Sequence, residues 1–208
     1  MSVVVVLFVV LAYGLGSIPS SYVAGRLRGV DLREHGSGNL GATNVYRVLG
    51  AATAIPVVVV DVAKGFVPAA VFPGWDGSAT SGLAVAYGLA AIAGHVWPFT
   101  LRFRGGKGVA TGAGVLLALA PLTTLIALLI WIGVVSLTRY VSVGSISTAT
   151  LVPLLAAGFD APGSTVAFCA VVAAFVWWTH RDNIRRLLAG TEHRFGSGRR
   201  PQRPGALE

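Results

Sequence analysis

The sequence predicts an all-α membrane protein with seven transmembrane helices, an extracytoplasmic N-terminus and a cytoplasmic C-terminus. Of its 208 residues, 54% are hydrophobic and only 12% are charged, whereas about a quarter of the residues in a typical soluble domain are charged. The apolar residues gather in long blocks, which need lipid around them because water would not tolerate so much uncovered apolar surface. Six blocks are visible, at 3–25, 51–73, 80–99, 108–138, 146–159 and 164–180.

The fourth block is too long for one upright span. At a rise of 1.5 Å per residue, a helix over 108–138 would be about 46 Å long, whereas the hydrocarbon core of a bilayer is about 30 Å thick. Pro121 lies near the middle of the block, where it would break a helix. The block is therefore either one strongly tilted span or two shorter spans that meet at Ala120–Pro121.

The placement of charge favours two spans. Lysine and arginine collect in the cytoplasmic loops of membrane proteins. Here they lie in the linkers 28–50 and 100–107, at Arg139 and at the start of the tail, whereas the linkers 72–79 and 159–163 carry only acidic charge. All basic segments share one side only if the fourth block is two spans. We therefore expect one seven-span domain over 1–195, followed by a flexible cytoplasmic tail at 196–208 that is rich in Arg, Pro and Gly.

The net charge of +8 and the cysteine content narrow the function. The basic residues lie between apolar blocks, and neither a basic helix nor an aromatic stacking module is visible, so nucleic acid is not expected as a partner. Anionic lipid or an anionic substrate fits the charge better. The single cysteine, Cys169, excludes an intrachain disulfide and a cysteine metal site. We expect neither a metal nor a cofactor.

A glycine-rich polar motif follows the first block. Residues 36–47 read Gly-Ser-Gly-Asn-Leu-Gly-Ala-Thr-Asn-Val-Tyr-Arg. The glycines allow tight turns that expose N–H groups as an anion nest, and the expected helix start near Thr43 adds positive dipole. Arg47 could clamp a phosphate in a bidentate manner. The alternative is a flexible loop with a solvated arginine, but the further polar residues favour a site that includes Ser37, Gly38, Asn39, Thr43, Asn44 and Arg47.

A second motif precedes and opens the fourth block. Residues 94–98 read Gly-His-Val-Trp-Pro, and residues 105–108 read Gly-Gly-Lys-Gly before an expected helix. Backbone donors, a lysine and a helix N-terminus are the physical elements of a phosphate loop, although the Walker pattern is not met. Lys107 with Gly105, Gly106 and Gly108 is therefore a candidate phosphate site. His95 is equally well explained as a structural residue.

Two further motifs lie at the same expected face. A short Ser/Gly loop at 139–146 offers Ser142 and Ser145 as donors to a phosphate or hydroxyl. His180 and Asn183 are three residues apart at the end of the last block and would share a helix face. Arginines 181, 185 and 186 are interpreted as interfacial anchors. Asp61 and Lys64, also three apart within the second block, are interpreted as a structural pair inside the bundle.

Four of these motifs, in this order, resemble one family. They are Gly-Ser-Ile-Pro-Ser at 16–20, Gly-Ser-Gly-Asn-Leu-Gly-Ala-Thr-Asn at 36–44, Gly-Gly-Lys-Gly at 105–108 and His-x-x-Asn-Ile at 180–184. The chain is similar, from about residue 14 to 192, to the bacterial membrane acyl-phosphate:glycerol-3-phosphate acyltransferases, the PlsY family. The resemblance implies seven spans with cytoplasmic catalytic loops, in the bacterial cytoplasmic (inner) membrane.

The resemblance also implies the chemistry. A fatty acyl group would pass from acyl phosphate to the 1-hydroxyl of glycerol 3-phosphate, giving lysophosphatidic acid and phosphate in the first step of phospholipid synthesis. Membrane lipid is an expected partner, and the enzyme that forms acyl phosphate is a further candidate. The competing class is a membrane transporter or channel for a phosphorylated organic anion, since helix N-termini aimed at anions also occur in transporters. Against it, no inverted repeat is visible and the polar motifs cluster on one face.

Site residues follow from the motifs and the resemblance together. An acyl phosphate is an activated mixed anhydride, so the protein needs mainly to position the substrates and stabilise charge. No side chain is an obvious general base, and a substrate phosphate is a candidate proton acceptor. The expected catalytic residues are Ser37, Arg47, Lys107, Ser145, His180 and Asn183. The expected substrate-binding residues are Gly38, Asn39, Thr43, Asn44, His95, Gly105, Gly106, Gly108, Ser142 and Glu192, with the N–H groups of Gly105 and Gly106 cradling the acyl phosphate.

Overall fold

The computed structural model describes residues 2–77 and 80–196, and the regular elements within them are all helical. Most of the predicted tail, 197–208, therefore lies outside the described residues. The α-helices are α1 Val3–Gly16, α2 Ser20–Arg26, α3 Ala42–Leu49, α4 Ala51–Trp75, α5 Ser81–Val96, α6 Val109–Leu119, α7 Pro121–Thr138, α8 Val141–Gly158, α9 Gly163–Thr179 and α10 Arg181–Leu188. A short 3₁₀ helix, η1, covers Phe99–Leu101.

Within residues 2–77 and 80–196, five helical segments are long and apolar enough to cross a membrane. They are Val3–Arg26, Ala51–Trp75, Ser81–Leu101, Pro121–Thr138 and Val141–Gly158. A sixth arises if α9 and α10, which meet at a bend of 55°, count as one span. Helix α6 is apolar but has only 11 residues, or about 16 Å.

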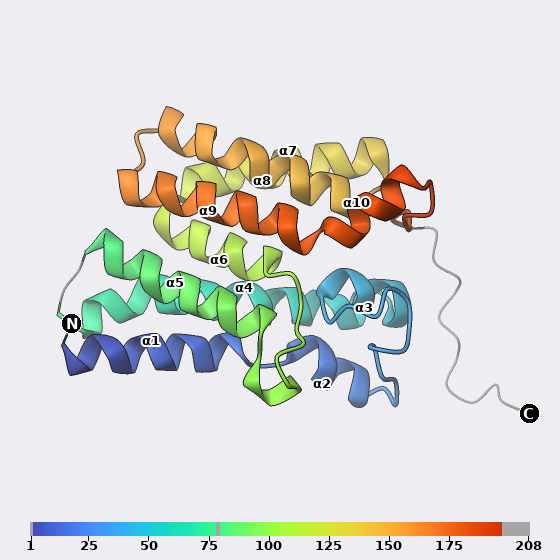
Figure 1. The fold of residues 1–208 in the computed structure, drawn as a ribbon, viewed down its shortest axis with the longest axis horizontal. Helices are drawn as coiled ribbons and strands as arrows, with labels where there is room; N and C mark the ends of the chain where they lie inside the picture. Colours follow the sequence, from blue (N-terminus) through green and yellow to red (C-terminus); the bar gives the residue numbers. More distant parts are fainter. Residues whose placement is uncertain (1, 78–79, 197–208) are drawn as a thin grey trace, which may run out of the picture.

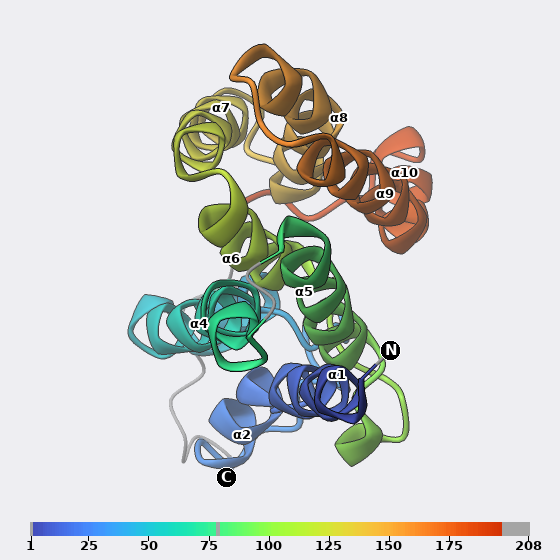
Figure 2. The same cartoon turned by 90° about the vertical axis from the view of Figure 1, so that its left-hand side faces the viewer.

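The long helices lie roughly side by side in two groups (Figure 1). Helices α1, α2, α4 and α5 form one group, and α7, α8, α9 and α10 form the other. Figure 2 shows α6 between the two groups. A buried cluster that includes Ala69, Ile92, Val115 and Phe168 joins α4, α5, α6 and α9 there. Helix α6 therefore connects the halves of the molecule through its apolar side chains.

The fourth apolar block breaks where the sequence predicts. Helix α6 ends at Leu119, Ala120 is non-helical with φ −151° and ψ 77°, and Pro121 is the first residue of α7. Proline suits the first position of a helix, because the N–H that it lacks would have no intrahelical acceptor there. The chain reverses its direction at this break (Figure 1).

Two boundaries differ from the sequence-based prediction. The first apolar block is not one helix, because α1 ends at Gly16 and α2 starts at Ser20, after Pro19. The segment 139–146 is not a loop, because α8 begins at Val141 and holds Ser142 and Ser145 on its first turns. Ser142 and Ser145 are three residues apart and consequently lie on one helix face.

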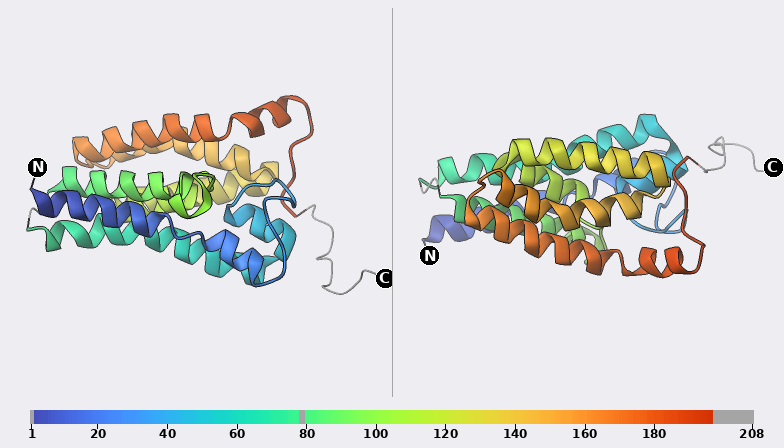
Figure 3. Two further views of the ribbon diagram at one scale, coloured as in Figure 1. Left: turned by 60° about the horizontal axis from the view of Figure 1, so that its bottom comes forward. Right: turned by 90° about the horizontal axis from the view of Figure 1, so that it is seen from above.

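The end of the molecule that carries α3 and α10 is crossed by an extended segment. After α10, residues 191–196 run from the end of α10 toward the α7–α8 turn and α3, which Figure 3 shows in both views. The main-chain N–H of Phe195 donates to the carbonyl of Arg139, and its ring stacks on Tyr46 of α3 with centroids 4.7 Å apart. The 191–196 segment thus touches both halves of the molecule.

Candidate active site

A cavity of about 1130 Å³ opens between the two halves. One part has apolar walls from the middle of α4, α6, α7, α8 and α9, including Val58, Leu117, Leu125, Val152 and Val172. The other part is polar and lies toward α3, α10 and the loop before α6. One cavity therefore has both an apolar channel and a polar end.

Lys107 stands at the polar end within a chain of hydrogen bonds. Its ammonium group donates to the side-chain oxygen of Asn183. The amide of Asn183 in turn donates to Glu192 Oε1 over 2.6 Å, and Ser142 Oγ donates to the same oxygen over 2.9 Å. Arg186 Nε donates to Glu192 Oε2 over 2.7 Å. Segments that are far apart in sequence thereby fix the lysine and the carboxylate together.

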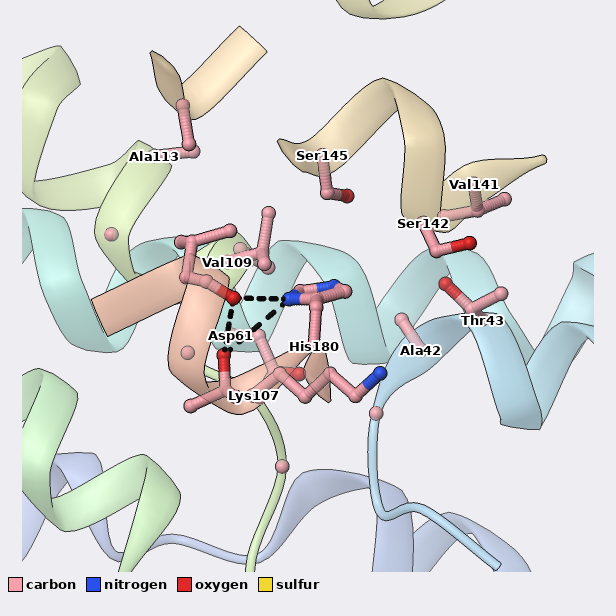
Figure 4. Close-up of a pocket in the computed structure, with 18 of the residues that line it drawn as sticks. Ala42, Thr43, Asp61, Lys107, Val109, Ala113, Val141, Ser142, Ser145 and His180 are labelled. Atoms are coloured by element: carbon pink, nitrogen blue, oxygen red, sulfur yellow. Dashed lines mark hydrogen bonds between the residues drawn. The ribbon is translucent and has the colours of Figure 1, made fainter. Parts of the chain in front are cut away.

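His180 faces the same space from the bend between α9 and α10. Its Nδ1 lies 2.8 Å from the carbonyl oxygen of Val176, which can only accept, so Nδ1 is the donor. The other ring nitrogen is left toward the cavity. Figure 4 shows His180, Lys107, Ser142, Ser145 and Thr43 around one shared space.

The loop before α3 is held by Asn44. Its Oδ1 accepts from the backbone N–H of Ser37 over 2.9 Å and from Arg47 over 3.3 Å. Its Nδ2 donates to the carbonyls of Leu32 and His35. With its side chain used in this way and only 1% exposed, Asn44 organises the loop, and it also lines the cavity.

The remaining residues of this loop divide into two kinds. Ser37, Asn39, Thr43 and Arg47 line the cavity. Gly38 adopts φ +69° and serves the turn. The N-terminus of α3 opens at Gly41 toward the cavity, so its positive dipole adds to the charge of Arg47 there.

The two N–H groups that the sequence analysis assigns to acyl phosphate have partners within the protein. The N–H of Gly105 donates to the carbonyl of Val96, and the N–H of Gly106 donates to the carbonyl of His95. These two groups hold the loop to the end of α5. Both glycines still line the cavity, and Gly108 caps α6 at φ +80°, a conformation that favours glycine.

Comparison with known proteins identifies the family of the chain that encloses this cavity. The sequence model of the family described as glycerol-3-phosphate acyltransferase matches residues 6–190. The chain belongs to that family. It is a membrane acyltransferase for glycerol 3-phosphate.

Relatives with the same name cover almost the whole acyltransferase. Glycerol-3-phosphate acyltransferase 2 of Moorella thermoacetica is 48% identical over 193 residues, which is 91% of this chain and 97% of the relative. The glycerol-3-phosphate acyltransferase of Geobacter sulfurreducens is 48% identical over 185 residues, 89% of this chain and 94% of the relative.

Two solved structures share the fold of the acyltransferase. They are crystal structures of PlsY (YgiH), an integral membrane glycerol 3-phosphate acyltransferase. The glycerol 3-phosphate form has a TM-score of 0.87 and 41% identity and covers 93% of this chain and 96% of that chain. The lysophosphatidic acid form has a TM-score of 0.85 and 40% identity, with the same coverage.

Burial sets the charge state at the polar end of the acyltransferase. Desolvation lowers the pKa of Lys107 to about 8, although the nearby Glu192 acts in the opposite direction. Burial alone would raise the pKa of Glu192, but hydrogen bonds from Asn183, Arg186 and Ser142 outweigh it and hold that pKa below its ordinary value. Glu192 is therefore a carboxylate at neutral pH, and Lys107 is a cation that loses its proton more easily than an exposed lysine.

Sequence reasoning missed two features of this site. Arg186, interpreted as an interfacial anchor, lines the cavity and pairs with Glu192. It lies three residues after Asn183, and this spacing on α10 could have revealed it. Trp131 Nε1 donates to Ser145 Oγ over 3.3 Å, a contact between α7 and α8 for which no sequence pattern gives a signal.

His95 lies in the cavity wall, and its ring packs against Gly106, the residue before Lys107. It is buried in α5, and its Nδ1 lies 3.7 Å from Asp61 Oδ1. Asp61 forms an ion pair of 2.9 Å with Lys64, as the structural interpretation of that pair predicts. His95 thus belongs to a buried polar cluster behind the glycine-lysine loop.

Proposed function

We propose that this protein transfers a fatty acyl group from acyl phosphate to the 1-hydroxyl of glycerol 3-phosphate. The products are lysophosphatidic acid and inorganic phosphate. The observation that carries the proposal is the cavity itself, in which a cationic polar end adjoins an apolar channel within the membrane region. An acyl phosphate has the matching form, with a phosphate at one end of a long hydrocarbon chain.

Each part of the site has an assigned task. Lys107, Arg47, His180, Asn183 and Ser145 hold the glycerol 3-phosphate. Ser37, Asn39, Thr43 and the N-terminus of α3 add donors for phosphate oxygens. The acyl chain lies in the apolar channel between α6, α7 and α8, where it remains in contact with the bilayer.

The reaction needs little covalent help from the protein. The 1-hydroxyl oxygen attacks the acyl carbonyl carbon, the new ester C–O bond forms, and the anhydride C–O bond to phosphate breaks. Phosphate is a good leaving group, and a phosphate oxygen of a substrate takes the hydroxyl proton. The cations stabilise the charge that shifts onto phosphate, and positioning accounts for much of the rate.

The topology follows from the fold and the charge pattern. Helix α6 serves as a short span that pairs with α7, so seven spans form one domain over 1–195. The N-terminus is then extracytoplasmic, and α3, α10 and the active site face the cytoplasm at the bacterial cytoplasmic membrane. The basic residues near Arg47, Lys107, Arg139 and Arg185 all lie on that side, as the positive-inside rule requires.

One pair of cysteine variants tests the topology. Gly163→Cys lies at the start of α9 and Arg185→Cys lies on α10, at opposite ends of the helices, whereas the native Cys169 is buried. A membrane-impermeant maleimide should label position 163 in intact cells and position 185 only after permeabilisation. The reverse pattern would invert the proposed orientation.

The donor is tested with purified protein in detergent. Palmitoyl phosphate and glycerol 3-phosphate should give phosphate and lysophosphatidic acid, whereas palmitoyl-CoA in place of palmitoyl phosphate should give no product. Product from palmitoyl-CoA alone would overturn the proposed donor while leaving the acceptor in place. The enzyme that forms acyl phosphate is a proposed partner, because its product is poorly soluble and is used in the same membrane.

A further inference from the structure

A charged pair lies buried in the membrane region, and its acidic member, Asp61, borders the cavity. Asp61 and Lys64 of α4 are 1% and 5% exposed and form an ion pair of 2.9 Å. Ser20 Oγ donates to Asp61 over 2.5 Å, and Lys64 Nζ donates to the carbonyl of Ile18 over 3.0 Å. The break between α1 and α2 supplies both of these partners.

Stability alone does not explain this pair. Removing two charges from water costs several kcal/mol per ion, and a buried pair replaced by apolar residues of similar volume often leaves a protein as stable or more stable. Ionisable residues inside a membrane protein commonly serve function. The question is therefore what else the pair touches.

The pair touches the histidine that supports the glycine-lysine loop. His95 Nδ1 lies 3.7 Å from Asp61 Oδ1, beyond hydrogen-bond distance. Among the described residues this buried nitrogen has no hydrogen-bond partner, so the carboxylate acts on the ring through packing and charge. On the other side of the imidazole, a Cβ placed on Gly106 would lie 2.2 Å from His95 Nε2, so the ring packs directly on the backbone before Lys107. The N–H of Gly106 also donates to the His95 carbonyl over 3.2 Å. A small cavity of about 10 Å³ is bordered by Lys64, His95 and Gly106 together.

We propose that Asp61 and Lys64 are positioning residues of the acyl transfer reaction. The Asp61 carboxylate orients the His95 imidazole through packing and charge, the imidazole sets the backbone at Gly106, and this backbone directs Lys107 to Asn183 at the polar end of the cavity. The inference rests on the role proposed for Lys107. It assigns a catalytic consequence to residues other than those proposed to hold the substrates.

A neutral pair separates positioning from stability. In Asp61→Leu/Lys64→Met both charges are removed at similar volume. The thermal midpoint in detergent should stay within a few degrees of wild type, while kcat/KM for glycerol 3-phosphate falls at least tenfold. Arg185→Met, which removes the exposed Asp182–Arg185 pair of the same i,i+3 spacing, should change neither quantity. A folded neutral-pair variant with wild-type kcat/KM would overturn the proposal.

Reversing the pair gives a second test, which remains informative if the neutral-pair variant folds poorly. Asp61→Lys/Lys64→Asp keeps an ion pair but takes the carboxylate away from Ser20 and His95. A structural role predicts that thermal midpoint and activity recover together. Positioning predicts that the midpoint recovers while kcat/KM stays at least tenfold low, and recovery of both would contradict it.

A double-mutant cycle tests the route through His95. Residues that act in one chain are not additive. In a His95→Asn background the neutral pair should therefore cost less than a third of the fold-change that it costs in the wild-type background. Equal fold-changes in both backgrounds would show that the pair acts elsewhere. If Lys107→Met is as active as wild type, the proposed function of the site fails instead, whatever the pair does.

Discussion

Lys107 is the residue on which the proposed site depends most. Its charge is held at the meeting point of Asn183 and the cavity, by a loop that is hydrogen-bonded to α5. We expect Lys107→Met to lower kcat/KM at least 100-fold, since the loss of one partner from a buried charge contact costs about 2–5 kcal/mol. The kcat/KM is measured as phosphate release from palmitoyl phosphate and glycerol 3-phosphate.

The matched control is Arg102→Met in the same loop, because Arg102 is exposed and does not form part of the cavity wall. Its activity should stay within twofold of wild type. A Lys107→Met enzyme with full activity would refute the central role assigned to this lysine.

The partly buried position of Lys107 also predicts a pH dependence. Desolvation lowers its pKa to about 8, so the ammonium form that attracts phosphate is present below pH 8 and is lost above it. The value of kcat/KM, which reports groups of the free enzyme, should fall as the pH rises through about 8. Bound phosphate favours the ammonium form, so kcat should fall only at higher pH.

A Lys107→Arg variant supplies the comparison, because a guanidinium stays charged throughout this range. Its kcat/KM should be lower at pH 7 but should not show the fall near pH 8. The profiles are measured between pH 6 and 10 with both substrates. A wild-type profile that is flat to pH 10 would assign the charge requirement to other groups.

At the scale of helices, α4 and α6 meet through a glycine. A Cβ on Gly65 would lie 2.0 Å from the carbonyl oxygen of Thr111, which is backbone of α6 and cannot turn aside. Small residues at such crossings let helices approach closely in membranes. Gly65→Ala must therefore push α6 away, at a cost of about 1–3 kcal/mol, and should lower the thermal midpoint in detergent by several degrees.

Gly74 of the same helix is the control, because a Cβ there meets nothing within 4 Å. Gly74→Ala should leave the midpoint unchanged or raise it slightly, since alanine is the better helix former. Equal effects of the two substitutions would show that α4 and α6 are not held at this distance.

Helix boundaries could be predicted where one residue decides them. Pro121 breaks the fourth block by its own covalent geometry, so the break at Ala120 is readable from sequence. The start of α8 is not, because the polar and small residues at 142–145 favour a turn locally. In the structure Ser142 donates to Glu192 and Gly144 packs under Trp131 and Val135. These tertiary contacts outweigh the local preference.

The same distinction applies to the site. Residue types suited to phosphate, such as Arg47 and Lys107, can be recognised in the sequence because they lie in glycine-rich motifs. Which acceptor each donor binds cannot be predicted in this way, since the N–H groups of Gly105 and Gly106 donate to carbonyls of α5. Likewise, Arg186 gains its partner only when the chain after α10 folds back. Such allocations depend on contacts between distant segments and require the structure.

At the scale of the whole molecule, the two helical groups enclose the cavity, and α6 and the 191–196 segment are two of the connections between them. Helix α6 connects them through the apolar core, and the 191–196 segment connects them at the polar end. Two side-chain hydrogen bonds tie that segment to the α7–α8 turn. Arg139 Nη2 donates to the Phe195 carbonyl over 3.1 Å, and Arg194 donates to the Tyr140 hydroxyl. Because Glu192 belongs to the same segment, its place beside Asn183 depends on how firmly both halves hold the segment.

Phe195→Ala should loosen this connection. The ring stacks on Tyr46 at 4.7 Å with 16° between the planes, and such pairs contribute about 0.5–1.5 kcal/mol beyond their buried area. Without it, Glu192 is held in its place for a smaller fraction of the time, and the apparent affinity for substrate falls by that fraction. The KM for glycerol 3-phosphate should rise about 3- to 10-fold while kcat changes less than twofold.

The control is Phe159→Ala, at the opposite end of α8 and 44% exposed, which should leave both constants unchanged. If KM is the same in both variants, the segment lies over the site without ordering it, and Glu192 must be fixed by Arg186 and Asn183 alone.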